Sequence, residues 1–168
     1  NFADGTLSLG SLAGTANLNK AGGGGTTTVE VGALGLDGTF SGALGDANGT
    51  LAVTKVGAGS QTFSGANTYA GQTTVSDGTL KLGHDAGLGF GGRHAVNVGV
   101  GGTQVDGTGI VDLDGRTVNE PITLAGGSLV NNNAAAATLA DGLAGIYYTN
   151  EGSGYTTTGS GVLSFTGG

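Results

Sequence analysis

The stretch Leu51–Gly83 most constrains what this chain can fold into, because its apolar residues alternate with polar ones in short runs that end at turn-forming residues. The alternating apolar residues are Leu51, Val53, Phe63, Val75, Leu80 and Leu82. Period-2 runs of about four to eight residues, bounded by Gly, Asn, Asp and Ser, indicate half-buried β-strands. Helix formers at helical spacing are missing, so the stretch predicts strands joined by turns.

A more specific pattern runs through the same stretch. Its parts are Lys55, Gly57-Ala58-Gly59, Ser64-Gly65-Ala66-Asn67-Thr68-Tyr69-Ala70-Gly71, Thr73-Thr74-Val75 and Gly78-Thr79-Leu80-Lys81-Leu82. With these residues the chain resembles the autotransporter-associated β-strand repeat, also called the passenger-associated transport repeat. Residues 49–83 match best. Two residues depart from the pattern: Gln61 stands where the family has an apolar residue, and Gln72 where it has a second glycine.

The resemblance implies structural roles for a set of residues in this repeat. They are Lys55, Gly57, Gly59, Gly65, Asn67, Tyr69, Gly71, Val75, Gly78, Leu80 and Leu82. We expect glycines and Asn67 at turns, apolar residues in the core, and Tyr69 packed at a turn. By alternation with Phe63, Gln61 points inward, where an unpaired amide costs about 1–3 kcal/mol. Either Gln61 bonds to a neighbouring coil or its strand carries a bulge.

The composition favours a narrow solenoid core. The chain has 39 Gly and 1 Pro, only 5% aromatic and 10% charged residues, and no Gly-X-Y period. A soluble domain has about 25% charged residues, so hydroxyls, amides and backbone must cover this surface. Regular alternation argues against disorder. Small and mid-sized inward residues suit a parallel β-helix, in which each coil must turn two or three times.

An internal repeat supports stacked coils. The segment Asp4–Gly10 recurs almost letter for letter as Asp77–Gly83, 73 residues later, which is about three coils of roughly 20–29 residues. Looser echoes start strands after glycine-containing turns at 37–42, 49–51, 127–130 and 161–165. We therefore predict an all-β fold, a right-handed parallel β-helix of about seven coils. Residues 1–168 form a single domain, a rod on the order of 35 Å long.

The remaining segments predict turns, strands and an end cap. The run Gly22–Gly25 is a linker or, as we favour, a broad turn, and glycine density predicts a loop over Gly83–Gly92. Further strands are expected around Val96–Val100, Ile110–Leu113 and Ile122–Leu124, with Pro121 at a strand start or bend, Asn131–Asn133 in a turn and Ala134–Ala140 in a strand or loop. Residues 141–168 resemble the repeat least and are a possible cap or contact region.

Charge and cysteine content exclude several classes of partner. The net charge is −7 with five Lys and Arg in total, which argues against binding nucleic acid or anionic membrane. Cysteine is absent, so disulfides and cysteine-ligated metals are excluded. No apolar run is long enough for a transmembrane helix, no signal peptide begins at Asn1, and we expect no membrane insertion by this segment and no cofactor. The chain looks like part of a longer, processed protein.

Few residues carry candidate chemistry. Asp106, Asp112 and Asp114 form the one local acidic cluster and are weak calcium candidates, although a solvated outward face is the favoured interpretation. His84 and His94 lie in or beside the glycine loop without a nucleophile motif, so surface histidines are expected. Tyr147, Tyr148 and Tyr155 could stack on sugar or protein, although a cap contact is favoured. No catalytic residue is assigned, and we do not expect an enzyme.

Three functions follow as hypotheses. The resemblance implies a structural segment of a secreted or surface-displayed autotransporter-like passenger, serving as stalk, scaffold or adhesin and exported across the outer membrane of a bacterium. Its partners would be a host or neighbouring-cell surface or a glycan. A second hypothesis is an extracellular fibre subunit that self-associates end to end through open β-edges. A third is a glycan-binding or glycan-cleaving β-helix.

Overall fold

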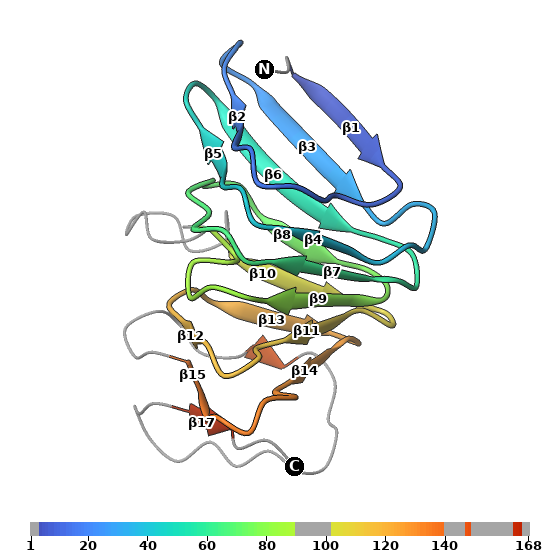
Figure 1. The fold of residues 1–168 in the computed structure, drawn as a ribbon, viewed down its shortest axis with the longest axis vertical. Helices are drawn as coiled ribbons and strands as arrows, with labels where there is room; N and C mark the ends of the chain where they lie inside the picture. The colour runs from blue at the N-terminus through green and yellow to red at the C-terminus, as the bar shows by residue number, and fades with distance from the viewer. Residues whose placement is uncertain (1–3, 90–101, 140–146, 149–162, 166–168) are drawn as a thin grey trace.

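A computed structural model gives the fold of this chain, and it describes residues 4–89, 102–139, 147–148 and 163–165. Within these ranges every regular element is a β-strand, and the strands stack as a parallel β-solenoid of about six turns (Figure 1). The first strand lies at one end of the stack and the last at the opposite end. The all-β solenoid predicted from the alternation is therefore confirmed.

The first sheet contains one strand from each coil. Its strands, in spatial order, are β1 (Gly5–Leu9), β3 (Thr26–Val31), β6 (Thr50–Lys55), β8 (Thr73–Val75), β10 (Thr103–Asp106), β13 (Ile122–Ala125) and β16 (Tyr147–Tyr148). All neighbours in this sheet are parallel. Because each strand pairs with the equivalent strand one coil later, seven strands enclose six turns of chain.

The other sheets line the remaining faces of the coils. The second sheet has the order β14 (Ser128–Val130), β11 (Ile110–Asp112), β9 (Thr79–Leu82), β7 (Ser60–Phe63) and β4 (Gly38–Phe40). Two small sheets contain β2 (Leu18–Lys20) with β5 (Leu44–Asp46), and β12 (Thr117–Val118) with β15 (Ala137–Leu139) and β17 (Leu163–Phe165). Among the described strands, only β17 pairs antiparallel, with β15.

The coils differ in length, as the irregular repeat predicts. The register of the first sheet pairs Gly5 with Thr27 and Val29 with Val53, so the first two coils take 22 and 24 residues. Later partners lie 20, 30, 19 and 24 residues apart. We number the coils 1 (4–26), 2 (27–50), 3 (51–72), 4 (73–102), 5 (103–121) and 6 (122–146).

Inward side chains stack in columns that form the core. All six alternating apolar residues named from the sequence are inaccessible to solvent: Leu51, Val53, Phe63, Val75, Leu80 and Leu82. Aromatic side chains also fit the interior, because Phe40 stacks on Phe63 as its register partner. The outward positions carry mostly Thr, Ser and Gln, so neutral hydrogen-bonding groups cover much of the described surface in place of charges.

One expectation from the internal repeat is wrong. Segment 4–10 contains β1 of the first sheet, whereas its twin 77–83 contains β9 of the second sheet. The two near-identical segments therefore do not stack three coils apart in one column. In each segment a strand follows an Asp-Gly corner, and such corners occur at more than one place in a coil.

Most local expectations are confirmed. Gly22–Gly25 is a turn between β2 and β3, Pro121 immediately precedes β13, Asn131–Asn133 is a turn, and Ala137–Leu139 is a strand. The segment Gly83–Gly89 forms turns. The strand expected around Val96–Val100 and the residues His94 and Tyr155 lie outside the described residues.

Candidate functional site

Several residues that define the repeat lie where one coil contacts the next. Lys55 ends β6 at the corner between the first and second sheets, and its side chain is inaccessible to solvent. Its Nζ donates hydrogen bonds to the carbonyl oxygens of Val56 (2.8 Å), Gly57 (2.6 Å) and Asp77 (3.1 Å). Burial lowers the pKa of Lys55, while the nearby carboxylates of Asp77 and Asp37 oppose that effect. The ammonium group therefore supplies hydrogen bonds to carbonyl oxygens of coils 3 and 4 at this corner.

Glycines permit the close approach of backbone at the same corner. Gly57 and Gly78 have φ values of 65° and 64°, a left-handed conformation that glycine adopts without strain. A Cβ at Gly57 would overlap the carbonyl oxygen of Gly32 in coil 2, and a Cβ at Gly78 would overlap that of Gly57. These glycines form a column in which each lies directly against the backbone of the preceding coil.

Asn67 links three coils at another corner. Its Oδ1 accepts the N–H of Leu44 in coil 2 at 2.9 Å, and its Nδ2 donates to the carbonyl of Gly87 in coil 4 at 2.7 Å. The side chain is inaccessible to solvent. The turn role implied for Asn67 is therefore accompanied by a second role, which is to hold the coils on both sides of its own.

Tyr69 packs inside the stack beside this corner. Its hydroxyl shares a 2.7 Å hydrogen bond with Thr73 Oγ1, and its ring is fully buried. Burial raises the pKa of Tyr69 well above its ordinary value. A buried, bonded phenol of this kind contributes packing, as the turn-packing interpretation predicts, and offers no surface for a sugar.

Gln61 points inward, and its amide is fully partnered. Its Oε1 accepts the N–H of Leu12 at 3.0 Å, and its Nε2 donates to the carbonyl of Leu12 at 2.8 Å. Leu12 lies in coil 1, two coils before Gln61, and Gly38 of coil 2 lies between them as the register partner of Gln61. A Cβ at Gly38 would lie 2.7 Å from both the Gln61 Oε1 and the Leu12 carbonyl. The amide of Gln61 does bond to a different coil, but its partner lies two coils away and not in the neighbouring coil that was predicted.

Five aspartates form further links, each to the following coil. Each accepts a hydrogen bond from an N–H or hydroxyl group of the next coil: Asp37 from Ser60 N, Asp46 from Ala70 N, Asp77 from Thr108 Oγ1, Asp85 from Thr117 N and Asp112 from Asn132 N. The distances lie between 2.7 and 3.1 Å. The Thr108 bond lowers the pKa of Asp77. These acidic side chains are occupied with holding coils together.

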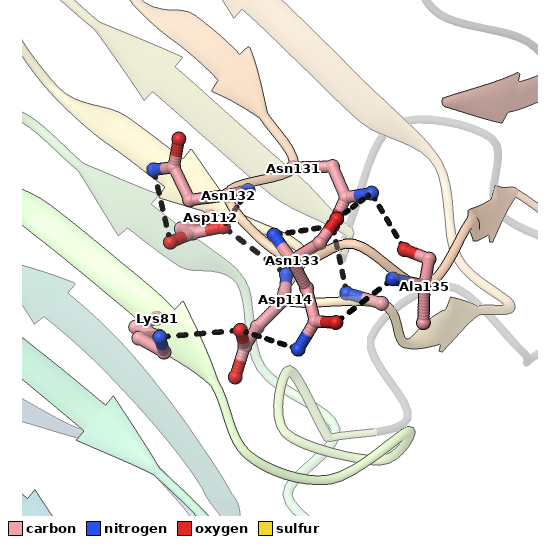
Figure 2. A network of polar contacts seen from close by, with 8 residues as sticks. Lys81, Asp112, Asp114, Asn131, Asn132, Asn133 and Ala135 are labelled. Carbon is pink, nitrogen blue, oxygen red and sulfur yellow. Dashed lines mark hydrogen bonds and ion pairs between the residues drawn. The ribbon is translucent and has the colours of Figure 1, made fainter. Parts of the chain in front are cut away.

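The three weak calcium candidates do not form one cluster. Asp112 and Asp114 both face the turn Asn131–Asn133, but Asp106 ends β10 in another sheet and accepts a bond from Gln104 Nε2 at 2.8 Å. Figure 2 shows the Asp112 and Asp114 carboxylates bonded to asparagine N–H groups and to Lys81. Among the described residues, no group of three or more His, Cys, Asp or Glu is arranged to hold a metal ion.

The expected solvated face is wrong for Asp112. Its exposed fraction is 3%, because the asparagine turn covers it, and its Oδ1 accepts the N–H groups of Asp114 and Asn132. For Asp114, burial raises the pKa, but hydrogen bonds from Asn133 and Lys81 outweigh it and lower the pKa overall. Asp114 itself adopts a φ of 45° at the corner.

Two buried ionisable residues were missed by the sequence reasoning. Lys20 is inaccessible to solvent, and its Nζ donates to Asp4 Oδ1 at 2.7 Å and to the carbonyl of Gly22. That hydrogen bond lowers the pKa of Asp4. The signal was present, because Lys20-Ala21-Gly22 repeats the Lys-x-Gly order of Lys55-Val56-Gly57.

Glu120 is the second missed residue. It is 8% exposed, it accepts a hydrogen bond from Thr103 Oγ1, and its Oε2 has no hydrogen-bond partner among the described residues. Burial raises its pKa to about 8, against the opposing effect of the Thr103 bond. Alternation could have placed it inward, because Val118 and Ile122 on either side are both buried.

The polar side chains described above form contacts between coils. His84 uses its Nδ1 to accept the N–H of Ala86 at 3.0 Å, within its own turn. The described part of the chain contains no helix of a length and apolarity suited to crossing a membrane.

Comparison with known proteins places the repeat in a family. Residues 53–82 match the sequence model of the passenger-associated-transport-repeat, which confirms the resemblance. The chain is also 29% identical to the adhesin BmaC autotransporter of Brucella suis biovar 1 (strain 1330) over 180 residues. This alignment covers 98% of the chain but 5% of that relative's length. No solved structure matches the chain significantly.

Proposed function

Since the chain carries a passenger-associated-transport-repeat, we propose that it is a stalk or scaffold segment of an autotransporter passenger. In this proposal the solenoid is right-handed with about seven coils. It is exported across the outer membrane, lies at the bacterial surface or outside the cell, and has no enzymatic activity. Residues 141–168 cover its last coil.

The direction of the polar side chains is the observation that carries this proposal. Lys55, Gln61 and Asn67 are buried, and each donates a hydrogen bond to a backbone carbonyl of another coil. Five aspartates accept hydrogen bonds from backbone N–H or hydroxyl groups of the following coil. A protein that acts on a substrate needs polar groups that converge on a shared space. Here the polar groups serve the continuity of the stack, as a stalk requires.

Stacked coils also suit export and folding outside the cell. Each coil of a solenoid contacts mainly its neighbours, so the stack can grow one coil at a time. The chain has no cysteine, and therefore no disulfide has to form before the stack is stable. The relative's name describes an adhesin, and we propose that this segment supports adhesion to a host cell, a neighbouring cell or a glycan.

Surface display in the source bacterium tests the proposal. An epitope tag inserted in the exposed turn that contains Leu34, whose exposed fraction is 74%, should bind antibody on intact cells. A matched tag replacing buried residues 61–63 should bind only after the protein is denatured. Staining of the Leu34 tag that requires permeabilised cells would contradict surface display.

A further inference from the structure

The turn between β5 and β6 holds the one Asn-Gly pair of the sequence, Asn48-Gly49. Both residues are exposed, and Gly49 adopts a φ of 82°, which lies in the left-handed region that glycine tolerates. The amide side chain of Asn48 forms no hydrogen bond with any residue that the structure describes. An exposed amide without a partner, directly before a glycine, is the arrangement in which asparagine reacts with its own backbone.

The backbone nitrogen that would react is available in this turn, although its neighbours are not. The N–H of Asn48 donates to the carbonyl of Lys20 at 3.3 Å. The N–H of Thr50 donates to the carbonyl of Gly25 at 3.0 Å. The N–H of Gly49, between them, has no such partner within the described part of the chain. The turn therefore leaves one backbone nitrogen unbonded, and it is the nitrogen next to the exposed amide.

This arrangement permits a reaction within the chain. The deprotonated backbone nitrogen of Gly49 attacks the side-chain Cγ of Asn48, so that the N–Cγ bond forms, the Cγ–Nδ2 bond breaks and ammonia leaves. The product is a five-membered succinimide ring. Water then opens the ring at either carbonyl and yields aspartate or isoaspartate at position 48, with no oxidation or reduction. Glycine favours the attack because it has no side chain to shield the nitrogen and its backbone adjusts readily.

The surroundings distinguish Asn48 from other described asparagines. Asn67 is inaccessible to solvent and bonded to the coils on both sides. Asn17 Oδ1 accepts the N–H of Ala43 at 2.9 Å, and hydrogen bonds drawn in Figure 2 hold the turn Asn131–Asn133. No asparagine of the sequence other than Asn48 is followed by glycine. Sequence and geometry therefore single out one site.

The two products have different consequences for the stack. A Cβ at Gly49 would lie 2.5 Å from the carbonyl oxygen of Gly25 and 2.7 Å from Lys20 Cε, so the backbone of coil 2 lies directly against coil 1 here. Isoaspartate lengthens the main chain by one methylene group. The N–H groups of Asn48 and Thr50 then cannot both keep their carbonyl partners in coil 1. Aspartate leaves the backbone unchanged, and Asp-Gly already stands at corners of this fold.

We propose that Asn48 is a site of spontaneous modification whose second reactant is water, and that the isoaspartate product loosens the contact between coils 1 and 2. The proposal goes beyond the stalk function and does not depend on it, because the reaction needs no enzyme and no partner. The modified fraction of the protein grows with its age. Each conversion replaces a neutral amide with a carboxylate, so the products differ from the natural chain in charge.

Peptide mapping by mass spectrometry tests the site on the purified, folded chain. A gain of one mass unit, from the exchange of an amino for a hydroxyl group, should concentrate at residue 48, give both isomers and proceed faster at higher pH. Asn48→Gln should slow the gain about tenfold or more, because its longer side chain closes a ring less readily. The matched control Asp37→Asn places the same dipeptide before β4. There the side chain accepts the N–H of Ser60 at 2.7 Å, and the gain should be about tenfold slower than at Asn48.

A stability measurement tests the effect on the coils. Ion-exchange chromatography separates the modified chains, and the isoaspartate form should unfold at a lower urea concentration than the natural chain. Asn48→Asp reproduces the other product and should unfold at the natural midpoint. No gain at residue 48 in the folded chain, equal rates at positions 37 and 48, or an isoaspartate form as stable as the natural chain would each overturn the proposal.

Discussion

The N-terminal coils, residues 4–89, differ from the C-terminal coils, residues 102–139, in whether long buried polar side chains have hydrogen-bond partners for all their polar atoms. In the N-terminal coils, Lys55 and Gln61 are buried with all their polar side-chain atoms in hydrogen bonds. In the C-terminal coils, Glu120 Oε2 and Arg116 Nε are buried without a hydrogen-bond partner among the described residues. The backbone of another coil supplies the partners in the first case and does not in the second.

The difference shows when an interior polar group stabilises a solenoid. A narrow core brings every inward side chain close to backbone of other coils, so a long polar side chain can replace a missing ladder bond. The same closeness removes water, which makes an atom without a partner costly. Removing a bonded group such as Lys55 or Gln61 should therefore destabilise the fold, whereas replacing the unpartnered carboxyl of Glu120 should stabilise it.

Lys55→Met should have the largest effect. The variant keeps the apolar stem but leaves the carbonyls of Val56, Gly57 and Asp77 without their donor. A buried acceptor left unsatisfied costs about 1–3 kcal/mol, and three carbonyls lose their donor together, so the loss should be at least about 3 kcal/mol, which chemical denaturation will measure. Lys81→Met is the matched control, because Lys81 is partly exposed and its ion pair with Asp114 is 3.2 Å long. The control should lose no more than about 1 kcal/mol; equal losses would contradict the role of the corner.

Glu120→Gln should act in the opposite direction and depend on pH. The pKa of Glu120 is raised from 4.5 to about 8 by burial. Below pH 4.5 both folded and unfolded chains hold the proton, so the carboxyl adds no pH dependence. As pH rises from 4.5 to 8 only the unfolded chain releases it, and the folded state loses about 1.4 kcal/mol per pH unit.

The neutral amide avoids this loss, so Glu120→Gln should exceed the natural chain in stability by up to about 3 kcal/mol at pH 7. The gain should vanish near pH 4. Thermal unfolding followed over this pH range measures both curves. A variant that is less stable than the natural chain at every pH would show that the Glu120 carboxyl has a partner.

Gln61→Leu tests a single contact between coils, that of the Gln61 amide with the Leu12 backbone. Leucine matches the apolar residue that the repeat family has at this position, yet the variant leaves the N–H and C=O of Leu12 without the bonds of 3.0 and 2.8 Å. Leu12 is 8% exposed, so water does not replace them. We expect a loss of roughly 1–3 kcal/mol in urea denaturation. An unchanged midpoint would mean that the amide contributes no more than an apolar side chain of its size.

Lys20→Met should have the smallest effect. Lys20 is buried like Lys55, but its partner Asp4 is 50% exposed at the end of the stack. Water can solvate that carboxylate after the ammonium is lost, so the loss should be on the order of 1 kcal/mol. Comparing its denaturation midpoint with that of Lys55→Met shows whether position in the stack sets the cost. A loss as large as that of Lys55→Met would contradict this view.

The sequence predicted the strands and the inward residues of the repeat because alternation directly encodes which face is buried. It could not predict which coil Gln61 contacts, because the partner is a backbone peptide 49 positions earlier that has no sequence signature. The prediction that Asp4–Gly10 and Asp77–Gly83 stack in one column was wrong, because an Asp-Gly corner can precede a strand of either sheet. The sequence also could not predict the low exposure of Asp112, because the turn that covers it lies 20 residues later in the chain.

Disulfide cross-links between register partners test the parallel stack most directly. Thr28 and Ala52 are outward neighbours in adjacent coils, and Thr6 is the partner of Thr28 one coil earlier. Thr28→Cys with Ala52→Cys should form an internal disulfide without loss of stability, because adjacent strands lie about 4.8 Å apart. Thr6→Cys with Ala52→Cys, two coils apart at about 9.6 Å, should remain reduced. Efficient closure of the second pair but not the first would contradict the solenoid.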